Sequence, residues 1–237
     1  METIYTIPVN EAFDEKCGCP FCRLYEKLEA NEVELILGAS MMEPDIRIQT
    51  NEKGFCGKHF QKLYLAQKRL PLALMLESHL EKIKKDCATP RISLKEKSGQ
   101  VAGAVASFTE KCYLCDRVEF HFGKMFETAC ILWDQDTEFR KKFAAQPYFC
   151  LPCYKRLLET AKFYIPKKKL PDFLDAAQEV EMKAISAAKD DISHFCKKFD
   201  YRYQNEPWGN ARDAVERSIV LLSGEKVTSE DETEEKE

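Results

Sequence analysis

Cysteine and histidine are the residue types of this chain whose spacing could do chemistry. The chain has 11 cysteines and 4 histidines, and eight of these residues form four pairs with two residues between the partners. The pairs are Cys19 and Cys22, Cys56 and His59, Cys112 and Cys115, and Cys150 and Cys153. Two intervening residues let a tight turn direct both donor atoms at one cation, and two such pairs complete a tetrahedron. The spacing therefore predicts metal-binding sites.

The same pairs predict an internal duplication. Corresponding ligands in the two halves lie 93, 93, 94 and 94 residues apart. Nearby residues repeat too: Phe55 matches Phe149, Phe60 matches Tyr154, Leu63 matches Leu157, and Arg47 matches Arg140. Agreement at ligands and neighbours together indicates two copies of one unit. We therefore expect one site in each copy. The first would use Cys19, Cys22, Cys56 and His59, and the second would use Cys112, Cys115, Cys150 and Cys153.

Zinc is the ion that this donor set favours. Zinc takes thiolate sulfur and imidazole in tetrahedral sites and needs no redox chemistry to hold a fold, so we expect two zinc ions per chain. Packing of apolar thiols does not explain the paired repeat, and disulfides do not persist in a reducing cytosol. His59 fits an all-thiolate iron–sulfur cluster poorly. Elemental analysis of the purified protein would decide between zinc and iron.

The other cysteines are expected to lie outside the sites. The segment CGCPFC offers three thiols for two places, and alignment of the two halves puts Glu110 opposite Cys17. Cys17 is therefore the spare thiol, although it could compete for metal or respond to oxidants. Cys87 lies on an apolar helical stripe, which predicts a role in packing. Cys130 and Cys196 lie among apolar residues, which predicts buried and inert thiols.

Motifs for catalysis are missing from the sequence. It has no P-loop, dinucleotide fingerprint, nucleophile elbow or HExxH helix. CPFC also occurs as a redox motif in glutaredoxin-like proteins, but no strand pattern precedes it here. His79, His121 and His194 lie singly in helical segments, where a structural role is expected. Four-ligand sites leave no open position for water or substrate, which disfavours catalytic zinc and predicts no catalytic residue.

Two classes of function remain open. The first is a non-enzymatic binding or scaffold protein, whose helical faces engage a protein partner. The second is a zinc–thiolate redox sensor, in which oxidation of the ligands releases the metal. We favour the first class, because the ligand pattern follows the logic of a folding site.

Apolar residues at helical spacing predict an all-α protein. We expect a helical bundle built from two zinc-nucleated modules and a long C-terminal helix that runs from Asp172 towards Gln204. Other helices are expected at residues 20–37, 57–66, 73–87, 118–133, 151–163 and 211–222. Thr3 to Val9 is predicted to be a short extended arm.

Charge and composition shifts suggest the domain organisation. We predict a first module at residues 1–88, a linker at 89–103, a second module at 104–165, packing helices at 166–224 and a disordered acidic tail at 225–237. The tail carries seven acidic residues and two lysines, so removing its charge of −5 from the formal −4 leaves the body at +1. A balanced body gives no reason to expect nucleic acid or an anionic membrane as partner. Without a long apolar run or a secretory signal, the expected location is the cytoplasm.

These motifs resemble those of a bacterial family, common in Firmicutes-like genomes, that is classified as a domain of unknown function. The segments that carry the resemblance are TIPVNEAF, CPFC, MEPDIRIQTNEKGFCGKHF, RLPLALMLESHL, CYLC, CLPC and EPWGNARDAVERSIVLLSG, within residues 3–224. The resemblance implies an intact domain and no established activity. The acidic tail lies outside it.

Overall fold

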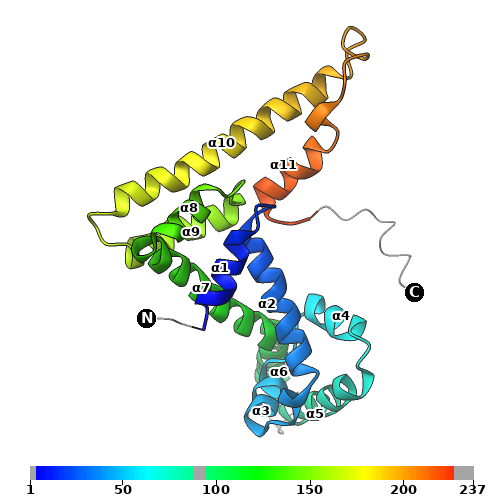
Figure 1. The fold of residues 1–237 in the computed structure, drawn as a ribbon. Helices are drawn as coiled ribbons and strands as arrows, with labels where there is room; N and C mark the ends of the chain where they lie inside the picture. Colours follow the sequence, from blue (N-terminus) through cyan, green and yellow to red (C-terminus); the bar gives the residue numbers. More distant parts are fainter. Residues whose placement is uncertain (1–3, 88–93, 227–237) are drawn as a thin grey trace. The chain divides into compact units, whose positions relative to one another are not determined.

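A computed structural model of the chain describes residues 4–87 and 94–226, and these residues form an all-α protein, as the sequence predicts (Figure 1). The α-helices are α1 (Thr6–Asp14), α2 (Pro20–Ile36), α3 (Pro44–Lys53), α4 (Gly57–Leu65), α5 (Arg69–Cys87), α6 (Leu94–Thr109), α7 (Tyr113–Gln135), α8 (Thr137–Ala144), α9 (Leu151–Tyr164), α10 (Leu170–Lys197) and α11 (Ala214–Ser223). Short 3₁₀ turns are η1 (Ala39–Met42) and η2 (Gly209–Ala211). The described helices are too short or too polar to cross a lipid bilayer.

Local sequence signals fix many helix ends. Helices α2 and α3 begin at Pro20 and Pro44, where proline lacks only an N–H that would be unpaired anyway. The side chain of Asp136 caps α8 by accepting from the backbone N–H groups of Glu138 at 2.8 Å and Phe139 at 3.2 Å. Gly224 ends α11 in the left-handed conformation, with φ of 76°. Of these signals, Pro20 marks the start of a helix that carries candidate ligands.

The described residues divide into two compact units. Of these residues, unit 1 comprises 4–24 and 123–226, and unit 2 comprises 25–87 and 94–122. The prediction of modules separated by a linker at 89–103 was wrong. Residues 94–103 belong to α6, while residues 88–93 lie outside the described part. Serine and glycine resemble linker composition, but Leu94, Lys95, Glu96, Lys97, Gln100 and Ala102 are residue types of high helix propensity.

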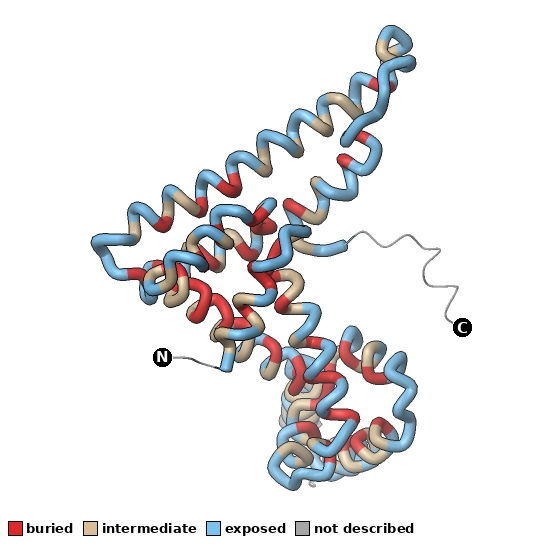
Figure 2. Tube along the Cα trace, viewed as in Figure 1, coloured by how far each residue is buried: buried red, intermediate tan, exposed pale blue. Residues whose placement is uncertain are grey.

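Unit 1 has a core that is rich in aromatic side chains. Figure 2 marks the buried positions along the chain. The fully buried phenylalanines of this core are Phe13, Phe21, Phe126, Phe139, Phe143, Phe149 and Phe173. The rings of Phe21 and Phe126 stack with centroids 3.9 Å apart, and those of Phe143 and Phe149 lie 5.0 Å apart. Phe21 lies between the two cysteines of CPFC, and Phe149 precedes Cys150, so this core supports two of the ligand pairs.

Helix α1 replaces the extended arm predicted for Thr3 to Val9, of which Thr3 lies outside the described residues. Its buried residues are Val9, Ala12 and Phe13, at spacings of three and four, which is the helical period. The prediction used too short a window to see this period. Helix α1 packs against α8 within unit 1.

A second core fills unit 2. It comprises Val33, Ile36, Leu37, Met41, Phe55, Leu63, Leu72, Met75, Cys112, Tyr113 and Leu114. Helices α3 and α5 pack together here, and Arg47 donates from Nη2 to the carbonyl of Leu74 at 3.0 Å. Leu63 and its predicted counterpart Leu157 are both fully buried, each in the core of its own unit.

The long helix α10 is shorter than predicted, because it ends at Lys197 rather than near Gln204. The next residue, Lys198, is buried, and its ammonium group donates to the carbonyls of Tyr203 at 2.9 Å and Gln204 at 2.6 Å. These bonds turn the chain back after α10. Cys196 is exposed, so the prediction of a buried thiol there was wrong.

Candidate metal centres

All four ligand pairs have the same position relative to a helix. The first residue of each pair directly precedes the helix, and the second lies in its first turn, at the starts of α2, α4, α7 and α9. The side chains of these two positions lie close together at a helix start, as they do in a capping box. The positive end of the helix dipole also favours thiolate over thiol. The sequence therefore folds each pair into a two-donor clamp.

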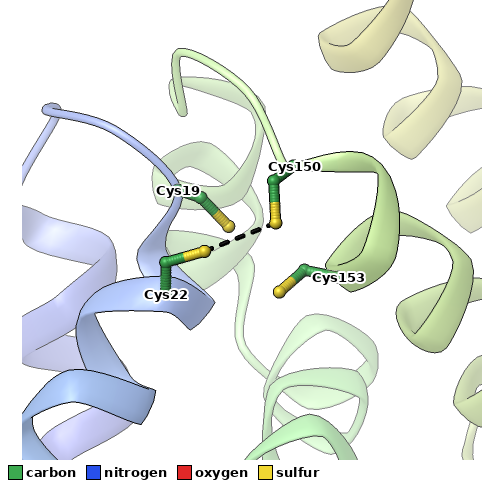
Figure 3. A group of neighbouring side chains, drawn as sticks. All are labelled: Cys19, Cys22, Cys150 and Cys153. Carbon is green, nitrogen blue, oxygen red and sulfur yellow. Dashed lines mark hydrogen bonds between the residues drawn. The ribbon is translucent and has the colours of Figure 1, made fainter. Parts of the chain in front are cut away.

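Site A, as we name it, consists of Cys19, Cys22, Cys150 and Cys153 (Figure 3). One pair comes from the start of α2 and the other from the start of α9, and their sulfur atoms point toward one another. All four sulfur atoms lie within 4.8 Å of one another, and those of Cys22 and Cys150 are 3.3 Å apart. Three of the four residues are buried, and Cys22 is half-buried. All four belong to unit 1.

Site B consists of Cys56, His59, Cys112 and Cys115, from the starts of α4 and α7. The Nδ1 atom of His59 lies 3.3 Å from the sulfur atoms of Cys56 and Cys112 and 3.4 Å from that of Cys115. The backbone N–H of Tyr113 donates to the carbonyl of Gly54 at 3.0 Å, which joins the two clamps. All four residues belong to unit 2, and Cys115 is exposed.

The eight predicted residues thus come together, but the predicted pairing was wrong. Each site takes one pair from each predicted copy rather than both pairs from one predicted copy. Helix α2 follows the first pair of copy one and rises about 25 Å over its 17 residues, and α7 rises about 34 Å over 23 residues in copy two. Closeness in sequence therefore does not bring the two pairs of a copy together. The spacing predicts each clamp but not its partner.

The pKa values of the thiols at site A indicate that the four thiols do not all ionise without a cation. Burial opposes ionisation of Cys19, but interactions with the thiols of Cys150, Cys153 and Cys22 lower its pKa well below the usual value. The pKa of Cys22 is raised by its contact with Cys150, and that of Cys153 is raised by Cys150 and Cys19. One thiolate is stabilised at the expense of the others, because like charges repel at this distance. Only a bound cation would let all four thiols ionise together.

Site B has the same property with one imidazole. Burial opposes ionisation of Cys56, but hydrogen bonds from the backbone of His59 and from the cysteines lower its pKa. The pKa of Cys115 is raised to about 12, first by burial and then by Cys112. Burial also lowers the pKa of His59, which keeps the ring neutral, and neutral imidazole is the form that binds metal.

The carboxylate of Glu29 lies behind the imidazole of site B. Its Oε1 atom lies 3.2 Å from Nε2 of His59, while the ring presents Nδ1 to the sulfur atoms. Burial acts against the charge of Glu29, but Lys62 and Lys58 bind the carboxylate and lower its pKa. A carboxylate behind a ligating histidine fixes its tautomer and raises its basicity. The role of Glu29 was not predicted from the sequence. Its position in the helical pattern is the same as that of an acidic residue on the surface.

Glu181 is the corresponding buried acid near site A, and it was also missed. It extends from α10, is fully buried, and accepts from the backbone N–H of Phe149 at 3.2 Å, next to Cys150. Burial raises the pKa of Glu181 to about 7, and the nearby Cys19 adds to this effect. The glutamate falls on the apolar stripe of α10, between Val180 and Ala184, and an acid on such a stripe is the signal that could have found it.

The remaining cysteines and histidines lie outside both sites. Cys17 is exposed, as a spare thiol should be, and Cys130 is buried with its pKa raised by burial to about 12. Cys87 is half-buried. His79 hydrogen-bonds through Nδ1 to the carbonyl of Asn51 at 2.9 Å, and His194 through Nε2 to that of Pro207 at 3.0 Å. These contacts are structural.

The donor sets fit a tetrahedral cation. Four sulfurs around zinc lie about 3.8 Å from one another, and a sulfur and an imidazole nitrogen lie about 3.6 Å apart. The separation is 3.3 Å between Cys22 and Cys150 and 3.8 Å between Cys56 and Cys115, which is near the zinc value and too long for a disulfide. Cys56 and His59 are 3.3 Å apart, and all donor atoms of each site lie within 4.8 Å of one another. Within the described ranges, these two clusters are the groups of His, Cys, Asp and Glu side chains that could hold a metal ion.

Fold and sites together define a class: an all-α protein with two four-donor centres, one all-cysteine and one with three cysteines and a histidine. Comparison with known sequences then places the chain. Residues 1–229 match the family described as "Family of unknown function (DUF6062)", and the chain belongs to that family. No curated protein and no solved structure matches it.

Proposed function

We propose that this chain is a non-enzymatic zinc protein in which two structural ions hold helix starts together and the helical surface binds a protein partner. The observation that carries the proposal is the completeness of both donor sets. Each site brings four donors to one point, and tetrahedral zinc with four protein ligands has no open position for a substrate. Metal binding of this kind contributes about 10 kcal/mol or more to folding, similar to the whole stability of a domain.

Elemental analysis tests the zinc assignment. We expect two equivalents of zinc per chain in the purified protein, and about one equivalent in Cys22→Ser and in Cys115→Ser. Both variants should melt at lower temperature, because each loses the folding energy of one ion. Cys17→Ser, which changes an exposed thiol outside both sites, is the matched control and should keep both ions. Two equivalents of zinc in both ligand variants would reject the proposal. Iron in the purified protein, together with visible absorbance, would show that the bound metal is iron rather than zinc.

Exposed aromatic side chains support a protein partner. Phe199 and Tyr201, beyond the end of α10, are 73% and 80% exposed, and Trp208 is 41% exposed. Aromatic residues of this kind are enriched at protein interfaces and costly to leave in water. A photo-crosslinking side chain at position 201 should capture a defined protein in cells, whereas one at the exposed, charged Asp190 of α10 should not. Identical products from both positions would argue against this surface.

The redox sensor is the second candidate, and site B favours it. Cys115 is exposed and Cys56 is half-buried, whereas three cysteines of site A are buried. Access controls the oxidation of thiolates, so mild peroxide should oxidise site B first and release its metal. A sensor would release one equivalent at low dose and recover it after reduction. A purely structural protein would keep both ions or precipitate.

A further inference from the structure

The C-terminal end of α11 lies directly on the sulfur atoms of site A. The carbonyl oxygen of Gly224 is 3.8 Å from Sγ of Cys22, a residue 202 positions earlier in the chain. A Cβ atom added to Gly224 would lie 3.0 Å from Sγ of Cys150 and 3.8 Å from Sγ of Cys22. Gly224 therefore touches one sulfur from each of the two clamps.

Helix capping alone does not account for this position. Gly224 has φ of 76°, and its N–H donates to the carbonyl of Val220 at 2.8 Å, which is an ordinary helix ending. Such an ending requires a conformation that glycine adopts easily, but it does not require an empty space beside a sulfur atom. Gly209 makes the comparison: its φ is 50°, yet an added Cβ would meet nothing within 4 Å. The contact with the thiols is a separate property of Gly224.

The attachment of α11 suggests how this contact acts. Ala214 and Leu221 are its buried residues, and the helix packs on α9 and α10, all within unit 1. Cys150 of site A directly precedes helix α9, and Cys153 lies in its first turn. Helix α11 thus rests on a helix that the metal site fixes, and its last residue closes over the sulfur atoms of that site.

We propose that Gly224 is a positioning residue of site A: the end of α11 covers the sulfur atoms of Cys22 and Cys150 and slows the exchange of the metal ion. This inference rests on the proposed metal binding at site A. A bound ion fixes both sulfur positions, so a side chain at residue 224 would have to displace either a sulfur atom or α11. By linkage, the ion in turn holds α11 in place.

The test measures the reactivity of each cysteine in the metal-loaded full-length protein. The protein is mixed with a zinc chelator and a thiol-alkylating reagent, and peptide mass spectrometry reads the rate at each cysteine. In Gly224→Ala we expect Cys22 and Cys150 to react about 10-fold faster than in wild type, with Cys56 and Cys115 unchanged. One of the two zinc equivalents should leave correspondingly faster.

Two variants separate the contact from backbone strain. Asparagine adopts positive φ more easily than alanine, so Gly224→Asn keeps the added Cβ with less strain. It should accelerate the same two cysteines. Gly209→Ala introduces strain without the contact and should leave all rates unchanged. Three results would overturn the proposal. The alkylation rates of Cys22 and Cys150 could be unchanged in both Gly224 variants, or faster in Gly224→Ala but not in Gly224→Asn. The same rates could also rise equally in Gly209→Ala.

A second pair of variants applies if the Gly224 variants do not fold. Leu221→Ala removes a buried anchor of α11 and should also expose Cys22 and Cys150 to the reagent. Leu222→Ala, one residue further and 59% exposed, should not. Continued protection in Leu221→Ala would show that α11 is not the cover. If the wild-type protein holds no metal, the proposed function is wrong. If it holds two ions but the alkylation rates of Cys22 and Cys150 do not differ between the variants and their controls, only the proposed role of α11 as a cover is wrong.

Discussion

Two buried carboxyl groups face the candidate sites, and their protonation differs because their neighbours differ. Burial opposes the ionisation of Glu29, but hydrogen bonds and charges of Lys62 and Lys58 lower its pKa. Glu181 has a single backbone N–H as hydrogen-bond donor and lies near the thiols of site A, so burial raises its pKa to about 7. The same residue type therefore serves as a charged support at site B and as a group that favours the neutral form near site A.

Glu29→Gln is expected to weaken site B. The neutral amide cannot hold the tautomer and basicity of His59 as a carboxylate does, so the zinc affinity of site B should fall about 10-fold or more. Competition with a calibrated chelator measures this change. Glu34→Gln, on the same helix with a largely exposed side chain, is the control. An unchanged affinity in Glu29→Gln would mean that the carboxylate does not support the ligand.

Glu181→Gln is expected to change stability in a pH-dependent way. Because the folded-state pKa is raised, the folded protein binds the proton more tightly, and the stabilisation from this proton is lost as pH rises from about 4.5 through about 7. The ionised group then costs roughly 3 kcal/mol, which glutamine avoids.

The measurement is the difference in melting temperature between Glu181→Gln and wild type from pH 6 to 8.5, with metal bound. This difference should grow in favour of the variant as pH rises. Glu179→Gln, at an exposed position of α10, should show no such trend. A difference that is constant over this range would contradict the raised pKa.

At the scale of elements, the starts of α2, α4 and α9 could be predicted, but the partner of each ligand pair could not. Helix α7 begins at Tyr113, five residues before the predicted start at residue 118. The paired spacing is a local signal that locates all four clamps, before α2, α4, α7 and α9. Prolines at the first turn support it only at α2 and α9. Which two clamps share a site depends on the way in which the long helices pack against one another, and no short-range sequence pattern encodes this packing. The same limit explains two wrong predictions. Helix α6 was predicted to be a linker because of its composition. Cys196 was predicted to be buried because it lies beside an apolar stripe, but the stripe continues beyond the core and the thiol is exposed.

Gly54→Ala should destabilise unit 2 at the end of α3. Gly54 has φ of 60°, and an added Cβ would lie only 2.6 Å from Nε2 of His79, which is buried. Strain and overlap together should cost about 2–4 kcal/mol. Thermal unfolding measures the loss. Gly209→Ala, with φ of 50° and open space, should cost only about 1 kcal/mol. Equal losses in the two variants would show that His79 moves aside freely.

At the scale of the whole molecule, the two sites have a nested order along the chain. Site A joins the first and fourth pairs, and site B joins the second and third. Each site lies inside one compact unit, and unit 2 is a continuous insertion between the two segments of unit 1. The duplicated pattern in the sequence is therefore compatible with ligands exchanged between the copies. Under this order, loss of one ion should loosen only the unit that contains its site.

Zinc content of paired-cysteine variants tests this arrangement most directly. Cys22→Ser with Cys150→Ser changes two ligands of site A, so the double variant should keep one equivalent of zinc. Cys22→Ser with Cys56→Ser changes one ligand in each site and should keep none. Wild type should contain two equivalents. The reverse result, with no zinc in the first double variant and one equivalent in the second, would show that each copy builds its own site and would contradict the nested arrangement.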